Sequence, residues 1–284
     1  MNEWFIYGII SIISTGFFSF SSKISVEKNH NPNLVTFYSS LIAAICSILY
    51  FIYSDGVIKN FYLEIILGIT NGLFYLVTVL TRIKSLKYID TGVYFPIYKA
   101  LGPILLLIIS ILYLSEKFTT IQSLGILLGI CVPFLLITKK SKSKNIKKGL
   151  IYLFVGLLAA IISGLSVKYA SIYKVNILLV VVYSLFFQTI GAYYLLKKHS
   201  RTDQNFSFDK IKSVGIVTGL LNFIGFYSFT SAVNLSGSIG LIYVMQSLYI
   251  IIPIILSVIM YKEHFDFKKF IAILLTITSI YFMK

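Results

Sequence analysis

The sequence predicts an all-α polytopic membrane protein with ten transmembrane helices, arranged as two inverted five-helix repeats. Three observations lead to this fold class. The chain of 284 residues is 57% hydrophobic and only 12% charged, and its mean hydropathy of +0.88 is far above that of soluble domains. Apolar runs long enough to cross about 30 Å of hydrocarbon as helices recur along the whole chain. Short patterns of the first half also recur in the second half.

The apolar runs give ten predicted spans, with the charged residues in the short connections between them. The first run follows "MNEW" and has neither a basic leader nor a small-residue cleavage site, so we interpret it as a retained helix. The fourth run contains the segment "YFPIYKALGPILLL", and a lysine-rich segment separates the fifth run from the sixth. The predicted spans are, in order, residues 4–22, 34–53, 61–81, 92–114, 121–138, 149–167, 175–196, 213–232, 237–260 and 269–283.

An internal repeat divides the chain into two halves. We expect a first five-helix repeat at 1–140, a basic linker at 141–148 and a second five-helix repeat at 149–284. Because five is odd, the second repeat must enter the membrane from the opposite side, which places a shared interface near the midplane and is typical of carriers. The recurring residues are Lys23 with Lys168, Tyr38 and Ser39 with Tyr183 and Ser184, Gly68 and Gly72 with Gly215 and Gly219, and Glu116 with Glu263.

A set of short motifs resembles the drug/metabolite transporter superfamily, in particular its EamA-type ten-helix members. The motifs are Pro103, the "SEK" at 115–117, the glycine-bearing "LGILLGI" at 124–130 and the segment at 22–38. The resemblance covers the full chain and implies a transporter whose third, fourth, eighth and ninth helices help line a central cavity. The second half departs from this pattern, because Ile250 stands in the place of Pro103 and a proline follows at Pro253.

Lys99 lies between two prolines inside the fourth span. On a helix, Pro96, Lys99 and Pro103 share one face within about 60°, and each proline leaves one carbonyl of the preceding turn without its usual donor. Such a face is costly in lipid, so we expect it to point to protein or to a water-filled cavity. We interpret Lys99 as a substrate-facing cation and Pro96, Pro103 and Pro253 as helix-breaking or gating residues. The alternative is that Lys99 snorkels to the interface or pairs with Asp90.

Further substrate-binding candidates follow helical spacing in both halves. Asn71, Tyr75, Thr78 and Arg82 form one stripe of the third span, and Asn222 belongs to the equivalent stripe of the eighth. Tyr98 directly precedes Lys99 in the fourth span. The repeat equivalent of Lys99 is Gln246, which lies one helical turn after Tyr243. The alternative for these polar residues is hydrogen bonding between helices. The predicted substrate-binding residues are Lys99, Tyr98, Asn71, Tyr75, Thr78, Asn222, Tyr243 and Gln246.

Four charged residues at span ends receive structural interpretations. Lys23 and Lys168 fall at exit ends of their spans, where lysine commonly anchors at the membrane interface. Glu116 and Glu263 occupy equivalent helix ends beside basic neighbours. No Asp or Glu lies deep in a span, which disfavours proton-driven export of cations, and a lone embedded lysine favours a carboxylate, phosphate or zwitterion.

These observations predict a secondary transporter of a small polar organic metabolite, anionic or zwitterionic, such as an amino acid or a related compound, working by alternating access. The alternatives are a membrane channel or, less favoured, a membrane-embedded lipid-modifying enzyme. We expect no catalytic residue, metal or cofactor. The net charge of +15 lies in the connections between spans, where lysines contact lipid headgroups. We therefore expect a lipid bilayer and no nucleic acid as partner. We expect a monomer in a bacterial-type plasma membrane. Loop charge predicts both termini outside, whereas the resemblance implies both inside, and orientation stays open.

Overall fold

The computed structural model describes residues 2–27, 31–54, 56–86, 88–89, 91–136, 145–199, 208–236, 238–262 and 265–284. These residues form α-helices joined by short connections, with one 3₁₀ turn, and no strand occurs among them. The elements are, in chain order, α1 (Glu3–Glu27), α2 (Pro32–Tyr53), α3 (Phe61–Leu86), α4 (Thr91–Leu112), α5 (Thr120–Leu135), α6 (Ile146–Ile172), α7 (Ile177–His199), α8 (Phe208–Ser236), α9 (Ile239–Ser247), η1 (Leu248–Ile250), α10 (Ile251–Tyr261) and α11 (Phe267–Met283).

Local sequence signals explain where several helices begin. The Asn31 side chain accepts hydrogen bonds from the first amides of α2, and Pro32 follows at a position where its missing N–H costs nothing. Thr119 and Gln122 form a reciprocal capping box at α5. Asp266 accepts a 2.9 Å hydrogen bond from the Lys269 amide at the start of α11.

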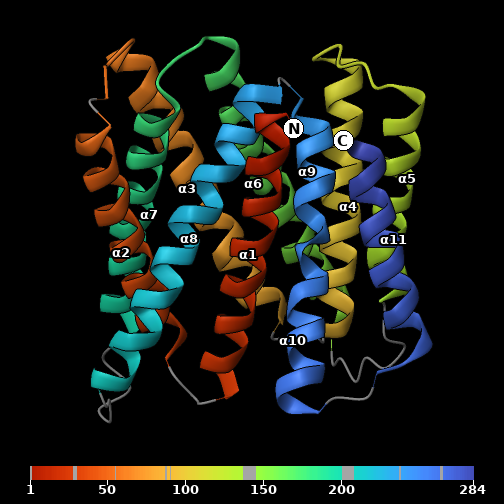
Figure 1. The fold of residues 1–284 in the computed structure, drawn as a ribbon. Helices are drawn as coiled ribbons and strands as arrows, with labels where there is room; N and C mark the ends of the chain where they lie inside the picture. The colour runs from red at the N-terminus through yellow and green to blue at the C-terminus, as the bar shows by residue number, and fades with distance from the viewer. Residues whose placement is uncertain are drawn as a thin grey trace.

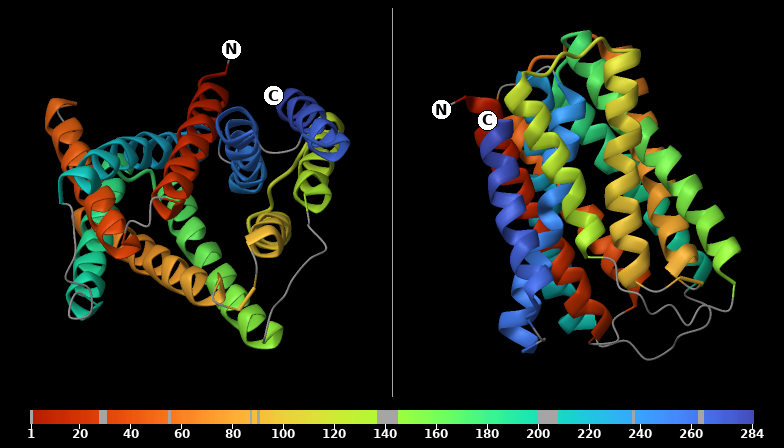
Figure 2. Two further views of the ribbon diagram at one scale, coloured as in Figure 1. Left: turned by 90° about the horizontal axis from the view of Figure 1, so that it is seen from below. Right: turned by 90° about the vertical axis from the view of Figure 1, so that its right-hand side faces the viewer.

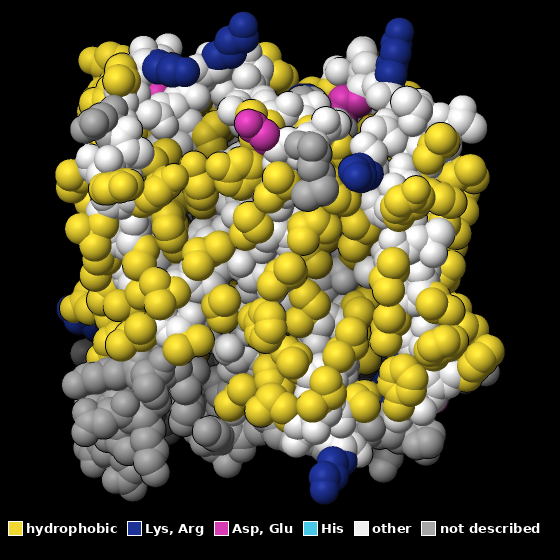
Figure 3. Space-filling model, viewed as in Figure 1, with side chains coloured by type: hydrophobic (Ala, Val, Ile, Leu, Met, Phe, Trp, Pro, Cys, Tyr) yellow, Lys and Arg dark blue, Asp and Glu magenta, His cyan; other side chains and the backbone are white. Residues whose placement is uncertain are grey.

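The surface of the bundle is that of a polytopic membrane protein. Within the described residues, eight helical segments are long and apolar enough to cross a membrane, and α5 is a shorter apolar helix. Figure 3 shows apolar side chains over the middle of one face, with lysines and arginines mainly toward the two ends. Leu49 and Ile52 of α2 are 61% and 67% exposed. In water such a surface would promote aggregation, whereas hydrocarbon solvates it.

The ninth predicted span is not one continuous helix. α9 ends at Ser247, and the 3₁₀ turn η1 at Leu248–Ile250 connects it to α10. Pro253 explains the position of this break, because its nitrogen cannot donate to the carbonyl of Tyr249 and its ring crowds that carbonyl. The amides of Leu248 and Ile251 instead bond carbonyls of the preceding turn. α4, in contrast, remains helical through Pro96 and Pro103.

The helices pack in pairs that join the two halves of the chain. α1 packs along α8 and α3 along α6, while α2 contacts α7 and α8. α4 packs on α9, and α5 packs on α11 at one side of the bundle (Figure 2). Both termini lie at the same end of the molecule (Figure 1), which we call the terminal end. The largest apolar core includes Leu106 of α4, Ile161 of α6 and Val244 of α9.

Two equivalent pairs of helices approach each other closely at glycines. A methyl group on Gly72 of α3 would lie 2.5 Å from the Ser184 carbonyl oxygen of α7. In the equivalent pair, a methyl group on Gly219 of α8 would lie 2.9 Å from the Ser39 carbonyl oxygen of α2. Both separations are too short for a side chain, so the absence of a Cβ permits these backbone contacts.

Candidate functional site

Two cations and five tyrosines gather deep in the bundle, and we call them the tyrosine-cation cluster. At 1.5 Å per residue, Lys99 lies about 12 Å from the start of α4, and Tyr249 lies about 15 Å from the start of α9. α4 and α9 begin at opposite ends of the bundle, so the two residues meet at mid-depth (Figure 1). The members are Tyr75 and Arg82 of α3, Tyr94, Tyr98 and Lys99 of α4, Tyr243 of α9 and Tyr249 of η1.

Lys99 is surrounded by aromatic rings. Its Nζ lies 4.1 Å from the centre of the Tyr249 ring and 5.7 Å from the centre of the Tyr98 ring. The Tyr98 ring stacks on the Tyr94 ring at a centroid distance of 5.7 Å. A cation over an aromatic face gains about 2 kcal/mol when desolvated, which is less than the several kcal/mol that removing an ammonium from water costs. The rings therefore offset only part of that cost.

Arg82 joins the cluster from α3. Its guanidinium lies beside the Tyr75 hydroxyl, and it interacts electrostatically with Tyr94, Tyr98 and Tyr249 as well. Both Arg82 and Lys99 are half-buried. Among the described residues, neither cation forms an ion pair with a carboxylate. The cluster is therefore a positively charged region whose polar neighbours are phenol hydroxyls.

Tyr94 supplies an unused polar group at this place. Its side chain is only 1% exposed, and its hydroxyl has no hydrogen-bond partner among the described residues. A buried hydroxyl without a partner costs about 1–3 kcal/mol. Because the Tyr94 ring stacks within the cluster and lies within electrostatic range of Arg82, this hydroxyl can donate to an anion bound there.

The structure places Asn71 and Thr78 outside the cluster. Asn71 is 2% exposed, donates to the Ser163 carbonyl at 2.8 Å and accepts from the Ser184 hydroxyl at 2.7 Å. Thr78 donates to the Gly156 carbonyl at 3.3 Å. Both side chains thus hold α3 against its neighbours, and their role in substrate binding stays a prediction. Of the predicted stripe, Tyr75 and Arg82 turn toward the cluster.

Gln246 and Asn222 also lie apart from the two cations. Gln246 donates to the Thr15 hydroxyl at 2.8 Å and accepts from the Ser11 hydroxyl at 2.8 Å, which joins α9 to α1. Asn222 is half-buried on α8, and no described contact connects it to the cluster. Tyr98 and Tyr243, in contrast, belong to the cluster together with Lys99.

The predicted gating prolines flank the cluster along the chain. Pro96 and Pro103 are buried in α4, on either side of Lys99. Pro253 lies in α10, directly after the η1 turn that carries Tyr249. The prolines therefore adjoin the two segments that supply Lys99 and Tyr249.

A second ionic site closes the terminal end of the bundle, and it corrects the interpretation of Lys168. The Lys168 side chain of α6 is 8% exposed and its Nζ lies 2.9 Å from Glu116 Oε1. The prediction that Lys168 anchors at the membrane interface is therefore wrong, because Lys168 pairs with Glu116 and both side chains are buried. Lys23, as a side chain, and Glu263 lie outside the described residues.

Glu116 also caps the start of α9. Its carboxylate accepts hydrogen bonds from the amides of Ile239 and Gly240 at 2.9 and 3.1 Å and from the Ser238 hydroxyl at 2.9 Å. Burial alone would raise the pKa of Glu116, but Lys168 and these donors outweigh burial and hold the pKa below its ordinary value. We call Glu116, Lys168 and Ser238 the terminal latch, since they join the α4–α5 connection to α6 and α9.

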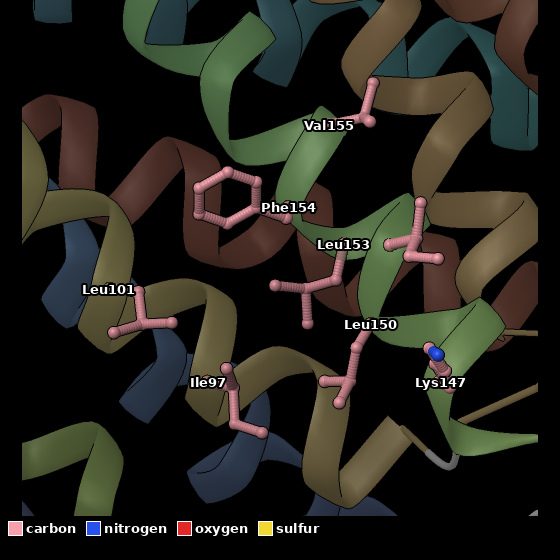
Figure 4. A pocket seen from close by; sticks show the side chains of 8 residues that line it. Ile97, Leu101, Lys147, Leu150, Leu153, Phe154 and Val155 are labelled. Carbon is pink, nitrogen blue, oxygen red and sulfur yellow. The ribbon is translucent and has the colours of Figure 1, made fainter.

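A groove on the surface of the bundle lies away from both sites. This groove of about 430 Å³ runs between α4 and α6 and is lined by apolar side chains such as Ile97, Leu101 and Phe154, with Lys147 at its edge (Figure 4). Leu101 and Phe154 are exposed on the outside of the bundle. The groove therefore belongs to the apolar outer surface and does not reach the tyrosine-cation cluster.

Three members of the cluster are absent from the predicted substrate-binding set: Arg82, Tyr94 and Tyr249. Arg82 ends the predicted polar stripe, and its helical spacing from Tyr75 is the signal that could have placed it beside the cluster. Tyr249 gave no such signal, because it lies six residues after Tyr243, off that residue's helical face, and its repeat equivalent is Gly102. The η1 turn, which periodicity does not reveal, brings it to Lys99.

Comparison with known proteins relates the whole chain to one family. The EamA-like transporter family matches residues 2–138 and 147–284. No curated protein matches the chain. A solved structure described only as the crystal structure of a protein is similar over 98% of this chain and 97% of its own, with a TM-score of 0.75 and 14% identity, which concerns the fold alone. A sodium–calcium exchanger soaked with Na⁺ and Sr²⁺, 16% identical over 98% of this chain and 96% of its own, has a TM-score of only 0.19 and carries no argument.

Proposed function

The chain belongs to the EamA-like transporter family of the drug/metabolite transporter superfamily, and from this premise we propose that it carries a small anionic or zwitterionic organic metabolite by alternating access. Membership establishes a multi-pass membrane transporter. The nature of the substrate and the mechanism are our inferences. They rest on the surroundings of Lys99 and on the pairing of the two halves.

The observation that carries the substrate proposal is a deep lysine with aromatic neighbours in place of a carboxylate. Lys99 has the Tyr249 ring at 4.1 Å, and the rings do not compensate the charge in full. A carboxylate or phosphate that enters the cluster gains charge-assisted hydrogen bonds from the ammonium. Tyr98 and Tyr243 supply rings that can pack against the organic part of the substrate.

The proposed mechanism needs two inverted repeats, with the boundaries 1–140, 141–148 and 149–284 and ten crossings when α9, η1 and α10 count as one. Packing supports this arrangement, because the contact of α1 with α8 corresponds to that of α6 with α3 when the halves are exchanged. Gly68 packs on Tyr183 and its repeat equivalent Gly215 packs on Tyr38, which is the repeat equivalent of Tyr183. Such an exchange of partners is expected of a pseudo-twofold axis in the membrane plane.

The terminal latch is the contact that we propose must break for the terminal end to open. It joins the first half, through Glu116, to α6 and α9 of the second half. Movement of one half against the other would separate Glu116 from Lys168. The η1 turn and Pro253 interrupt α9 and α10 close to the cluster, where a change of backbone angle would be least costly.

Proteoliposomes test the proposal. We expect saturable uptake of an organic anion that is stimulated by the same anion inside the vesicles, and the Lys99→Gln variant should reduce kcat/KM by about tenfold or more. Lys147→Gln, which removes an equally charged side chain from the outer surface, is the matched control. Non-saturating conductance would favour a channel, and unchanged kinetics in Lys99→Gln would remove the cluster from substrate binding.

A further inference from the structure

Arg82 has more hydrogen-bonding capacity than its surroundings use. A guanidinium carries five N–H donors and no acceptor, and the polar neighbour recorded beside it is the single hydroxyl of Tyr75. Tyr75 is also the only α3 member of the cluster besides Arg82. The charged neighbours of the guanidinium are tyrosines and, among the described residues, include no carboxylate. A planar acid group is the partner that matches such a fork of donors.

Tyr249 connects Arg82 with Lys99. It contacts Lys99 directly and interacts electrostatically with Arg82 from across the cluster. Two positive charges thus lie near one tyrosine in a partly buried site, where they repel each other more strongly than they would in water. One negative charge would leave a net positive charge in place, whereas two negative charges would balance both cations.

We propose that the substrate carries two acidic groups, with Arg82 binding one of them and Lys99 binding the other. This inference rests on the proposed function and narrows the substrate class of the same site. The Arg82 fork suits two parallel hydrogen bonds to a carboxylate or phosphate, and the Lys99 ammonium acts as a point charge for the second group. The buried hydroxyl of Tyr94, which has no partner, donates to the acid group near Arg82.

Binding measurements on purified full-length protein test this assignment. The probes are malonate, succinate, glutarate, adipate and phosphoglycolate, each compared with a monoamide or uncharged-phosphate analogue of the same length. The dependence of the unfolding temperature on probe concentration gives the affinity. We expect the wild type to bind one diacid at least about tenfold more tightly than its monoamide, because the amide leaves one cation uncompensated. The carboxylate and phosphate probes distinguish the two kinds of acid group.

Variants of Arg82 decide whether this residue causes the preference. Arg82→Gln should lower the affinity for the diacid to that for the monoamide and leave monoamide binding unchanged, whereas Arg82→Lys should keep part of the preference. Tyr75→Phe removes the neighbouring hydroxyl and keeps the charge, so it should retain the preference. These results together would support the two-cation site.

Other results would overturn the inference. If Arg82→Gln weakens diacid and monoamide equally, or if the wild type binds both alike, the site recognises one acid group. In that case Lys99→Gln would still weaken both probes, and the proposed function would stand. If neither diacid nor monoamide stabilises the wild type, the two-acid inference and the anionic substrate both fail.

Discussion

Two lysines inside the bundle of this transporter lie in opposite surroundings. Lys168 has Glu116 at 2.9 Å and lies in the terminal latch, whereas Lys99 has tyrosine rings and, among the described residues, no carboxylate. Both lysines belong to apolar helices. The difference indicates that a charge balanced inside the protein closes and stabilises the bundle, and that a charge left without a carboxylate is available to a ligand.

The largest effect should come from breaking the latch. Glu116→Gln removes the carboxylate that pairs with the buried Lys168, which should cost about 3–5 kcal/mol of unfolding free energy. Chemical unfolding in one detergent measures this loss. Glu3→Gln is the control, because Glu3 is exposed and its change should stay within about 0.5 kcal/mol. Equal stabilities of the two variants would show that the latch does not stabilise the protein.

Acid should weaken the same latch. The pKa of Glu116 is lower in the folded protein than in the unfolded chain, so the unfolded chain takes up the proton first and acid favours unfolding. The contribution of the carboxylate is present above the ordinary value of 4.5 and is lost as the pH falls through the lower folded pKa. The stability difference between wild type and Glu116→Gln should therefore shrink on acidification, and a constant difference would contradict the ion pair.

A smaller effect should come from the cluster. Tyr94→Phe removes a buried hydroxyl that has no partner, so the empty protein should gain about 1 kcal/mol of unfolding free energy. The same change should weaken binding of an acidic ligand several-fold. Tyr53→Phe, on a side chain that is 84% exposed, is the matched control. Loss of stability in Tyr94→Phe would mean that the hydroxyl already has a partner.

Sequence periodicity predicted an all-helical membrane protein, whereas the count of ten spans and the substrate-binding residues stay predictions. Apolar runs and prolines are local properties, so the spans, the depth of Lys99 and the position of Pro253 could be predicted. Within the stripe from Asn71 to Arg82, the sequence pattern does not distinguish residues that hydrogen-bond neighbouring helices from residues that face the cluster, because both kinds are polar.

Contacts between segments that are far apart in the sequence could not be predicted from local sequence patterns. The pairing of Lys168 with Glu116 joins positions in different halves of the chain. The approach of Tyr249 to Lys99 depends on a 3₁₀ turn. The first requires the α4–α5 connection to lie against α6, and the second requires the packing of α4 on α9, neither of which follows from spacing along one helix.

The most direct test of the contrast between the two lysines is the unfolding free energy of Lys168→Met and Lys99→Met, measured without organic anions in the same detergent. Lys168→Met should lose about 3 kcal/mol, because Glu116 stays buried without its cation. Lys99→Met should keep the wild-type stability or gain about 1 kcal/mol, because a charge without a counter-ion is removed. A loss in Lys99→Met as large as that in Lys168→Met would contradict the account.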